Sequence, residues 1–118
     1  MQRTLLKSKL HGATVTQADM HYEGSISIDR ELLKQANMLP YEKVDIYNIT
    51  NGNRFSTYII EGGAGEIGLN GAAARLVQVG DQVIIATFAN YFDDECIGHK
   101  ALKLIMGPNN TVKEIIHD

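Results

Sequence analysis

The chain has 118 residues, of which 44% are apolar and 21% charged, and its formal net charge is −3. These values indicate one soluble globular domain over residues 1–118 and exclude a disordered chain. The sequence has no apolar run of membrane-spanning length, no signal-like N-terminus and no cluster of Lys or Arg. We therefore expect a cytoplasmic protein that binds neither membranes nor nucleic acids.

The first third of the chain alternates short β-branched runs with turn residues, a pattern typical of a small β barrel or sandwich. We expect strands at residues 5–10, 13–16 and 25–28. Asp29 is then placed to cap a helix within residues 30–38, and Pro40 lies beyond the end of that helix. The apolar face of this helix comprises Leu32, Leu33 and Ala36.

The remaining chain continues the β pattern. Asn51-Gly52 is a strong hairpin signal, and it predicts that residues 42–50 pair with residues 54–62. A short strand at 66–70 is followed by a short helix that Asn70 can cap. Gly80-Asp81 then turns the chain into a long strand, 82–92. A last hairpin is expected from residues 101–107, 108–110 and 111–116.

Three segments contain residues that could react or bind a ligand. Each of them can also be explained by a purely structural role. Gly24-Ser25 is either a bend before a strand or a reactive serine, although the hydrolase pattern G-x-S-x-G is absent. Arg54 and Tyr58 share one strand face, either as a carboxylate clamp beside a proton donor or as a solvated surface. The small residues 71–73 at a helix start can bind an anion through backbone N–H groups, or can serve close packing.

Metal and disulfide chemistry find no support in the sequence. The four histidines form no H-x-H or H-E-x-x-H pattern, and Cys96 is the only cysteine. We therefore predict no metal site and no internal disulfide.

The order of these segments is more specific than any one of them. Residues 1–90 contain "KLHGATVTQADMHYEGS", "NGNRFSTYII", "NGAAA" and "VGDQVIIATF" in succession. This series resembles the bacterial aspartate α-decarboxylase family, whose motifs are Y-x-G-S, N-G-x-R-F-S-T-Y, N-G-A-A-A and V-G-D. The stretch from Asn90 to Asp118 carries no part of the resemblance.

The resemblance implies a mainly β fold, a double-psi β-barrel with short helices, assembled as a homotetramer. It also implies self-cleavage between Gly24 and Ser25 into residues 1–24 and 25–118. Ser25 would become a pyruvoyl cofactor that forms a Schiff base with L-aspartate, without pyridoxal phosphate or metal. The product would be β-alanine for pantothenate biosynthesis. We further expect Gly24 to hold backbone angles that residues with side chains avoid.

The resemblance also implies roles for the matching residues. Thr57 would stabilise the oxyanion at Gly24 during cleavage, and Tyr58 would donate a proton during catalysis. Arg54 would bind the side-chain carboxylate of aspartate, with Lys9 as a second cation. Further contacts to the substrate would come from Gly71, Ala72, Ala73, Tyr22 and Asn70.

Two competing interpretations of the same residues remain. A double-psi barrel that only binds ligands would need the strands and glycines, but not this whole set of reactive side chains. A serine hydrolase is disfavoured because no His and Asp partners occur at a recognisable spacing.

Overall fold

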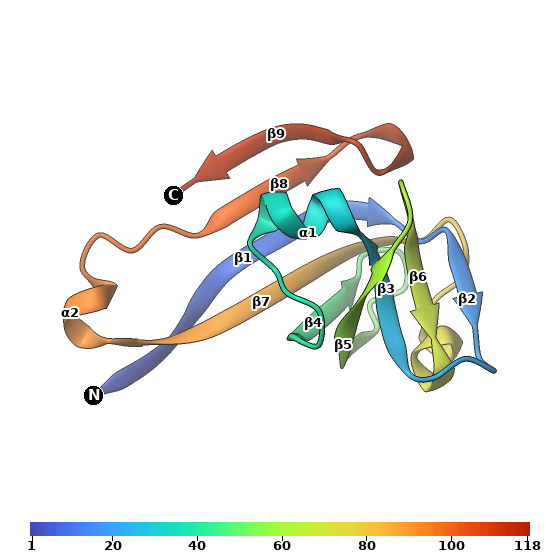
Figure 1. Cartoon of the computed structure of the whole chain (residues 1–118), viewed down its shortest axis with the longest axis horizontal. Coiled ribbons are helices and arrows are strands. Elements are labelled where there is room, and N and C mark those ends of the chain that lie inside the picture. The colour runs from blue at the N-terminus through green and yellow to red at the C-terminus, as the bar shows by residue number, and fades with distance from the viewer.

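A computed structural model describes all residues, 1–118, as a mainly β fold (Figure 1). One mixed sheet of nine strands has the order β2-β6-β3-β5-β4-β7-β1-β8-β9. The strands are β1 Gln2–Thr14, β2 Gln17–Asp19, β3 Ser25–Asp29, β4 Lys43–Asn48, β5 Arg54–Gly62, β6 Ile67–Asn70, β7 Gln82–Phe92, β8 Leu102–Met106 and β9 Val112–His117. The helices are α1 Arg30–Ala36 and α2 Asp93–Cys96, with 3₁₀ turns η1 Gly71–Leu76 and η2 Pro108–Asn110. No helix is both long and apolar enough to cross a membrane.

The sheet curls around one hydrophobic core of 19 buried residues, which confirms the expected mainly β, barrel-like fold. Alternation along the strands generates this core, because successive side chains point to opposite faces. In β4, for example, Val44 and Ile46 are buried while Asp45, between them, is not. Their partners in the neighbouring strands, such as Ile85 and Phe55, extend the same layer.

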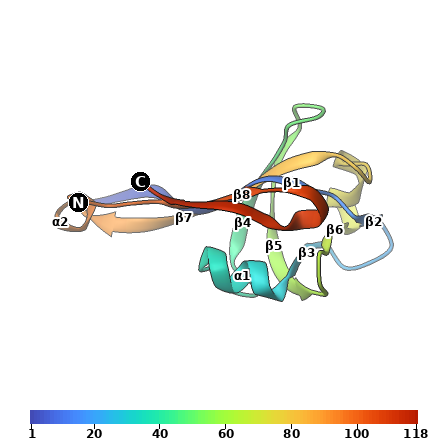
Figure 2. The same cartoon turned by 90° about the horizontal axis from the view of Figure 1, so that it is seen from above.

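The strands β1 and β7 form a long antiparallel pair that extends beyond the core. Figure 2 shows this pair running out to the end of the molecule where the N-terminus and α2 lie. The molecule is accordingly elongated, with extents of 44 × 28 × 25 Å.

The predicted bounds of the first two strands, 5–10 and 13–16, are wrong. Residues 5–10 and 13 and 14 belong to one strand of 13 residues, β1, and the chain pairs again only at β2. Two register shifts against β7, at Leu6/Ser8 and at His11/Ala13, let this long strand bend. Gly12, with φ +84°, lies at the second shift, so the glycine marks a bulge rather than a chain break.

The helix prediction is confirmed at its start and on its buried face. The Asp29 carboxylate accepts the backbone N–H of Glu31 at 2.8 Å, which caps α1. The buried residues of the helix are Leu32, Leu33 and Ala36. Asn37 ends it in the left-handed conformation, with φ 56°, a position that asparagine tolerates.

Both predicted hairpins are confirmed. β4 pairs antiparallel with β5 around Asn51-Gly52, and β8 pairs antiparallel with β9 around η2. The short strand β6 does not join β5, its predecessor in sequence. Instead β3 lies between them, parallel to β5 and antiparallel to β6. This insertion places β3, which begins at Ser25, inside the sheet between β6 and β5.

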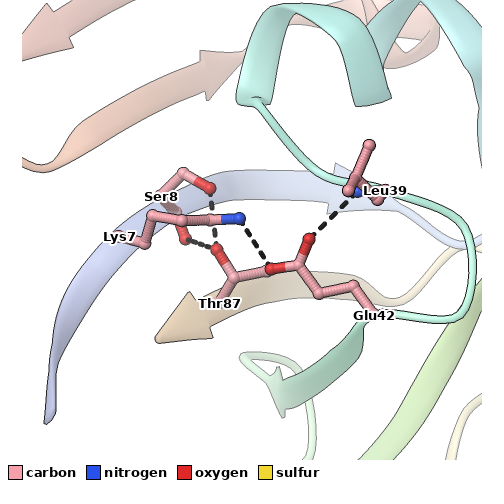
Figure 3. Close-up of polar contacts among 5 residues, drawn as sticks. All are labelled: Lys7, Ser8, Leu39, Glu42 and Thr87. Carbon is pink, nitrogen blue, oxygen red and sulfur yellow. Dashed lines mark hydrogen bonds and ion pairs between the residues drawn. The ribbon is translucent and has the colours of Figure 1, made fainter. Parts of the chain in front are cut away.

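Polar contacts connect β1 to its neighbours at the edge of the core (Figure 3). The buried hydroxyls of Ser8 and Thr87 lie 2.8 Å apart and join β1 to β7. Lys7 Nζ lies 2.7 Å from Glu42 Oε2, and Glu42 Oε1 accepts the backbone N–H of Leu39 at 3.0 Å. The ion pair therefore holds the connection between α1 and β4 against β1.

We expect Lys7→Met to lower the free energy of unfolding by about 1 to 2 kcal/mol, since it leaves a largely buried carboxylate without its cation. The side chains of Lys7 and Glu42 are only 21% and 22% exposed. Lys34→Met is the matched control, because Lys34 and Glu31 are 69% and 66% exposed and 3.6 Å apart. Its effect should stay within about 0.5 kcal/mol. Urea unfolding measures both, and equal losses would contradict this assignment.

Candidate active site

Cross-strand register places several of the predicted site residues, but not Thr57, on the outer face of the sheet. Ser25 pairs with Asn70, and Tyr58 pairs with Lys43. The parallel pairing of Ile26 with Ile59, continued one residue back, sets Ser25 beside Tyr58. Paired residues point to the same face, so these four residues form one row across β6, β3, β5 and β4.

Ser25 is buried, with 1% of its surface exposed, and its hydroxyl has two partners. Asn70 Nδ2 donates to Ser25 Oγ at 3.0 Å and to Ser27 Oγ at 3.0 Å. Ser25 Oγ in turn donates to the carbonyl oxygen of Glu23 at 3.1 Å. The side-chain amide of Asn70 thus fixes both serines of β3.

Asn70 occupies the expected position before a short helix, but the expected side-chain cap is wrong. The Asn70 side chain forms no capping hydrogen bond to η1. Its amide is used by the two β3 serines instead, so it serves the sheet rather than the helix.

Gly71 makes the closest backbone approach at the site. A Cβ on residue 71 would lie 2.6 Å from the Cα and 2.8 Å from the nitrogen of Gly24. Gly71 also has φ +66°, which disfavours any residue with a side chain. The sequence NGAAA therefore begins with a glycine because its backbone packs on the Gly24-Ser25 segment.

The expectation that Gly24 itself is conformationally strained is wrong. Gly24 is not among the residues with positive φ, and a Cβ on it would meet no atom within 4 Å. The steric demand for glycine falls on its neighbour, Gly71.

The small residues at the start of the 3₁₀ turn η1 differ in solvent exposure. Gly71 is buried, Ala73 is partly buried and Ala72 is exposed. Tyr22, on the other side of Gly24, is 55% exposed. Tyr22 and Ala72 are thus solvent-exposed, whereas Gly71 and Ser25 are buried.

Thr57 faces away from Arg54 and Tyr58, as the alternation of β5 predicts. It pairs with Val44, whose side chain is in the core. Continuing the β3–β5 register two residues back from Ile26 and Ile59 sets Thr57 beside Gly24. The backbone arrangement is thus compatible with a Thr57 hydroxyl near the Gly24 carbonyl.

Tyr58 is half-buried and stacks on Tyr41, with ring centroids 6.2 Å apart and an interplanar angle of 25°. Tyr41 has φ 70° and donates its N–H to the carbonyl oxygen of Ile59 at 2.7 Å. The Tyr58 ring is therefore supported from the connection that precedes β4.

Arg54 does not lie beside Ser25 within the chain. It is four residues from Tyr58 along β5, about 13 Å at the usual rise of a strand. Its guanidinium carbon lies 4.1 Å above the centroid of the Tyr47 ring, on β4. Arg54 and Tyr47 line a cleft of about 230 Å³ with Asp45, Phe55 and Ser56.

Lys9 lies on the same outer face, but further across the sheet. It pairs with Ala86, Ala86 pairs with Asp45, and Asp45 pairs with Ser56. Lys9 is thus three strand spacings from β5, about 14 Å. Within a single chain, Arg54 and Lys9 are therefore both distant from Ser25, and they are also distant from each other.

His11, near Lys9, and Tyr47, beside Arg54, have shifted pKa values. Burial, and secondarily the charge of Lys9, lowers the pKa of His11, whose Nδ1 is buried without a hydrogen-bond partner. Burial and the Asp45 carboxylate raise the pKa of Tyr47, although Arg54 opposes this. Tyr47 consequently remains a protonated phenol at neutral pH and can donate a hydrogen bond.

Three residues around Arg54 were not predicted from the sequence: Tyr47, Asp45 and Ser56. Counting outward from Asn51-Gly52 would not have found them, because the register is centred on Thr50-Asn51 and pairs Tyr47 with Arg54 and Asp45 with Ser56. Residues at equal distances from a hairpin turn face each other across the two strands.

Comparisons with known proteins agree with the motif order. The aspartate decarboxylase family matches residues 1–113. The chain belongs to the aspartate decarboxylase family. Among similar proteins, the aspartate 1-decarboxylase of Ralstonia nicotianae is 55% identical over 117 residues, 98% of each chain. The aspartate 1-decarboxylases of Cupriavidus necator and Syntrophus aciditrophicus are 53% and 56% identical, covering 98% and 96% of this chain and 98% and 99% of their own.

The family match extends beyond the motifs quoted above. It includes most of the tail after Asn90, which forms the hairpin of β8 and β9. In this family member the tail is part of the sheet, because β8 pairs in parallel with β1.

We expect Gly71→Ala to lower the free energy of unfolding by about 2 to 5 kcal/mol, combining a strained φ with a clash on Gly24. Gly12→Ala is the matched control, because Gly12 also has positive φ but a Cβ added there would meet no atom within 4 Å. It should cost about 1 to 2 kcal/mol. Urea unfolding of the two variants compares them, and equal losses would refute a close contact at Gly71.

Proposed function

We propose that this chain cuts itself between Gly24 and Ser25, into residues 1–24 and 25–118, and then converts L-aspartate to β-alanine and carbon dioxide. In the cell this reaction would supply β-alanine for pantothenate biosynthesis in the cytoplasm. The observation that carries the proposal is the buried Ser25, held by Asn70 beside Gly24 and Gly71, in a member of the aspartate decarboxylase family.

In the proposed cleavage the Ser25 hydroxyl attacks the carbonyl carbon of Gly24 and converts the amide into an ester. The structure describes the intact chain, in which this hydroxyl donates to the Glu23 carbonyl. It must therefore rotate toward Gly24 before attack. Thr57, adjacent in the extended register, is the proposed donor to the oxyanion.

β-Elimination then breaks the bond between Ser25 Cβ and Oγ. Residues 1–24 leave with a terminal carboxylate, and position 25 becomes dehydroalanine. Water replaces the nitrogen of this group, which is released as ammonia, and a pyruvoyl group remains. The carbon skeleton of the cofactor therefore comes from Ser25.

The surroundings of residue 25 fit a pyruvoyl group. Cleavage removes Ser25 Oγ, so Asn70 Nδ2, which donates to it in the intact chain, becomes free to donate to the new group or to the substrate, and Gly71 adds no side chain next to residue 25. Such a group supplies an electrophilic carbonyl that accepts the electron pair left by the departing carboxylate, so neither pyridoxal phosphate nor a metal is needed.

The substrate would be oriented by its two carboxylates. Arg54 suits bidentate binding of the side-chain carboxylate, and Lys9 adds positive charge. A strong cation at the α-carboxylate would stabilise the ground state more than the transition state, since that group loses its charge. We therefore assign Arg54 to the carboxylate that is retained.

Within one chain Arg54 lies too far along β5 to hold an aspartate whose amine is at residue 25. We propose that the Arg54 serving each Ser25 belongs to a second copy of the chain. A homotetramer with sites between subunits would satisfy this separation. Backbone N–H groups of Gly71, Ala72 and Ala73, with Tyr22 and Asn70, would border the site on the Ser25 side.

Tyr58 is the proposed proton donor to Cα of the product. Its ring lies on the outer face beside Ser25 and is supported by Tyr41. A phenol held in one orientation can deliver its proton to one face of the substrate.

We expect purified protein to contain residues 1–24 and 25–118 as separate fragments. The larger fragment should be lighter by one ammonia than a 25–118 fragment that begins with an unmodified serine. Intact-mass spectrometry measures both fragments. Ser25→Ala should stay uncut, whereas the control Ser27→Ala, which also loses a hydroxyl bonded to Asn70, should be cut. An active sample of uniformly intact chains would overturn the proposal.

We expect Arg54→Ala to raise KM for L-aspartate about 30- to 150-fold, because a charge-assisted contact to a carboxylate is lost. Tyr58→Phe should lower kcat with little change in KM, because it removes a proton but no binding charge. Steady-state kinetics on cleaved protein separate the two effects. Normal turnover of Tyr58→Phe would require another proton source.

A further inference from the structure

Arg54 is restrained by an aromatic ring rather than by a carboxylate. Its guanidinium carbon lies 4.1 Å above the centroid of the Tyr47 ring, directly across the β4–β5 pair. None of the chain's ion pairs includes Arg54. Contact through the flat face of the guanidinium leaves the N–H groups at its edge available for a ligand.

A carboxylate is nevertheless close by. Asp45 lies one outer-face row from Arg54 and lines the same cleft of about 230 Å³. An unoccupied carboxylate there would compete for the guanidinium, since Arg and Asp form strong bidentate pairs.

Each oxygen of Asp45 already accepts a hydrogen bond from a hydroxyl group, which lowers its demand for a further donor. Ser56 Oγ donates to Asp45 Oδ1 at 2.8 Å, and the Tyr47 hydroxyl donates to Asp45 Oδ2 at 3.3 Å. The donors are Asp45's direct cross-strand partner and the residue that supports Arg54. One cluster therefore both stacks the arginine and satisfies the neighbouring acid.

We propose that Tyr47, Ser56 and Asp45 are positioning residues that keep Arg54 available for the side-chain carboxylate of a dicarboxylic substrate. The role of Arg54 rests on the proposed function; the assignment of the other three rests on the contacts of this cluster. Ser56 and Tyr47 satisfy the hydrogen-bonding demand of Asp45, and the Tyr47 ring holds the guanidinium in place.

A rescue experiment distinguishes this role from a merely structural one. Ser56→Ala frees one oxygen of Asp45 to pair with Arg54, so KM for L-aspartate should rise about three- to fivefold, the scale of one exposed ion pair, with kcat unchanged. Adding Asp45→Asn removes the competing charge and should return KM to near the parent value. A structural defect would instead worsen with the second substitution.

Tyr47 variants test the ring and the hydroxyl separately. Tyr47→Leu removes both the ring and the hydroxyl, so it should raise KM about two- to fivefold more than Tyr47→Phe does, as expected for an exposed cation–π contact. Tyr47→Phe keeps the ring and should raise KM only through the freed Asp45 oxygen, an effect that Asp45→Asn should again reverse. Tyr91→Leu is the matched control, since it removes another aromatic contact, to His99, far along β7. It should leave KM unchanged.

Calorimetric binding of succinate, a dicarboxylate without an amine, separates this inference from the proposed function. Succinate needs neither the cleaved chain nor a reaction, so its dissociation constant should follow the same order in the intact and cleaved proteins. Weaker binding to Ser56→Ala, restored by Asp45→Asn, supports the cluster even if no decarboxylation occurs. Parent-like binding to both Ser56→Ala and Tyr47→Leu, failure of the rescue, or no succinate binding by the parent would overturn it.

Discussion

The register of β5 against its two neighbours is the constraint on which the site depends. On one side the parallel pairing of Ile26 with Ile59 sets Ser25 beside Tyr58. On the other, antiparallel pairing with β4 sets Tyr47 opposite Arg54. A slip of one residue would turn the core residue Ile59 outward and the polar residues of β5 inward. Burial of Ile26, Ile46 and Ile59 therefore holds the polar face in its arrangement.

A second constraint couples the Gly24-Ser25 segment to η1. The backbone of Gly71 lies against that of Gly24, and Asn70, immediately before it, binds Ser25 and Ser27. One dipeptide thus supplies both the close contact and the hydrogen-bond donor. Because residue 71 has no side chain, the two backbones can lie this close together, and Ser25 is buried.

Within one chain, Ser25 and Tyr58 are separated from Arg54 and Lys9, so the expected site residues do not form a single site there. The outer face of one sheet carries all of these residues, but Arg54 is about 13 Å from Tyr58 along β5, and Lys9 is about 14 Å from β5 across the sheet. In the proposed assembly, Ser25 and Tyr58 of one copy come together with Arg54 and Lys9 of another copy. The Asp45, Tyr47 and Ser56 cluster nonetheless restrains the arginine within its own chain.

The sequence by itself determined the local elements and the family. Asp29 with its apolar face specified α1, Asn51-Gly52 specified the β4–β5 hairpin, and the order of motifs indicated an aspartate decarboxylase. These features depend on residues close together in the chain, or on motif identity, and both can be read directly.

Tertiary structure alone decided the rest. The insertion of β3 between β5 and β6, the use of Asn70 by the serines and the demand for glycine at position 71 all join residues far apart in the chain. No local pattern encodes such contacts, because they arise only when the curled sheet closes around its core and brings distant backbones within van der Waals distance.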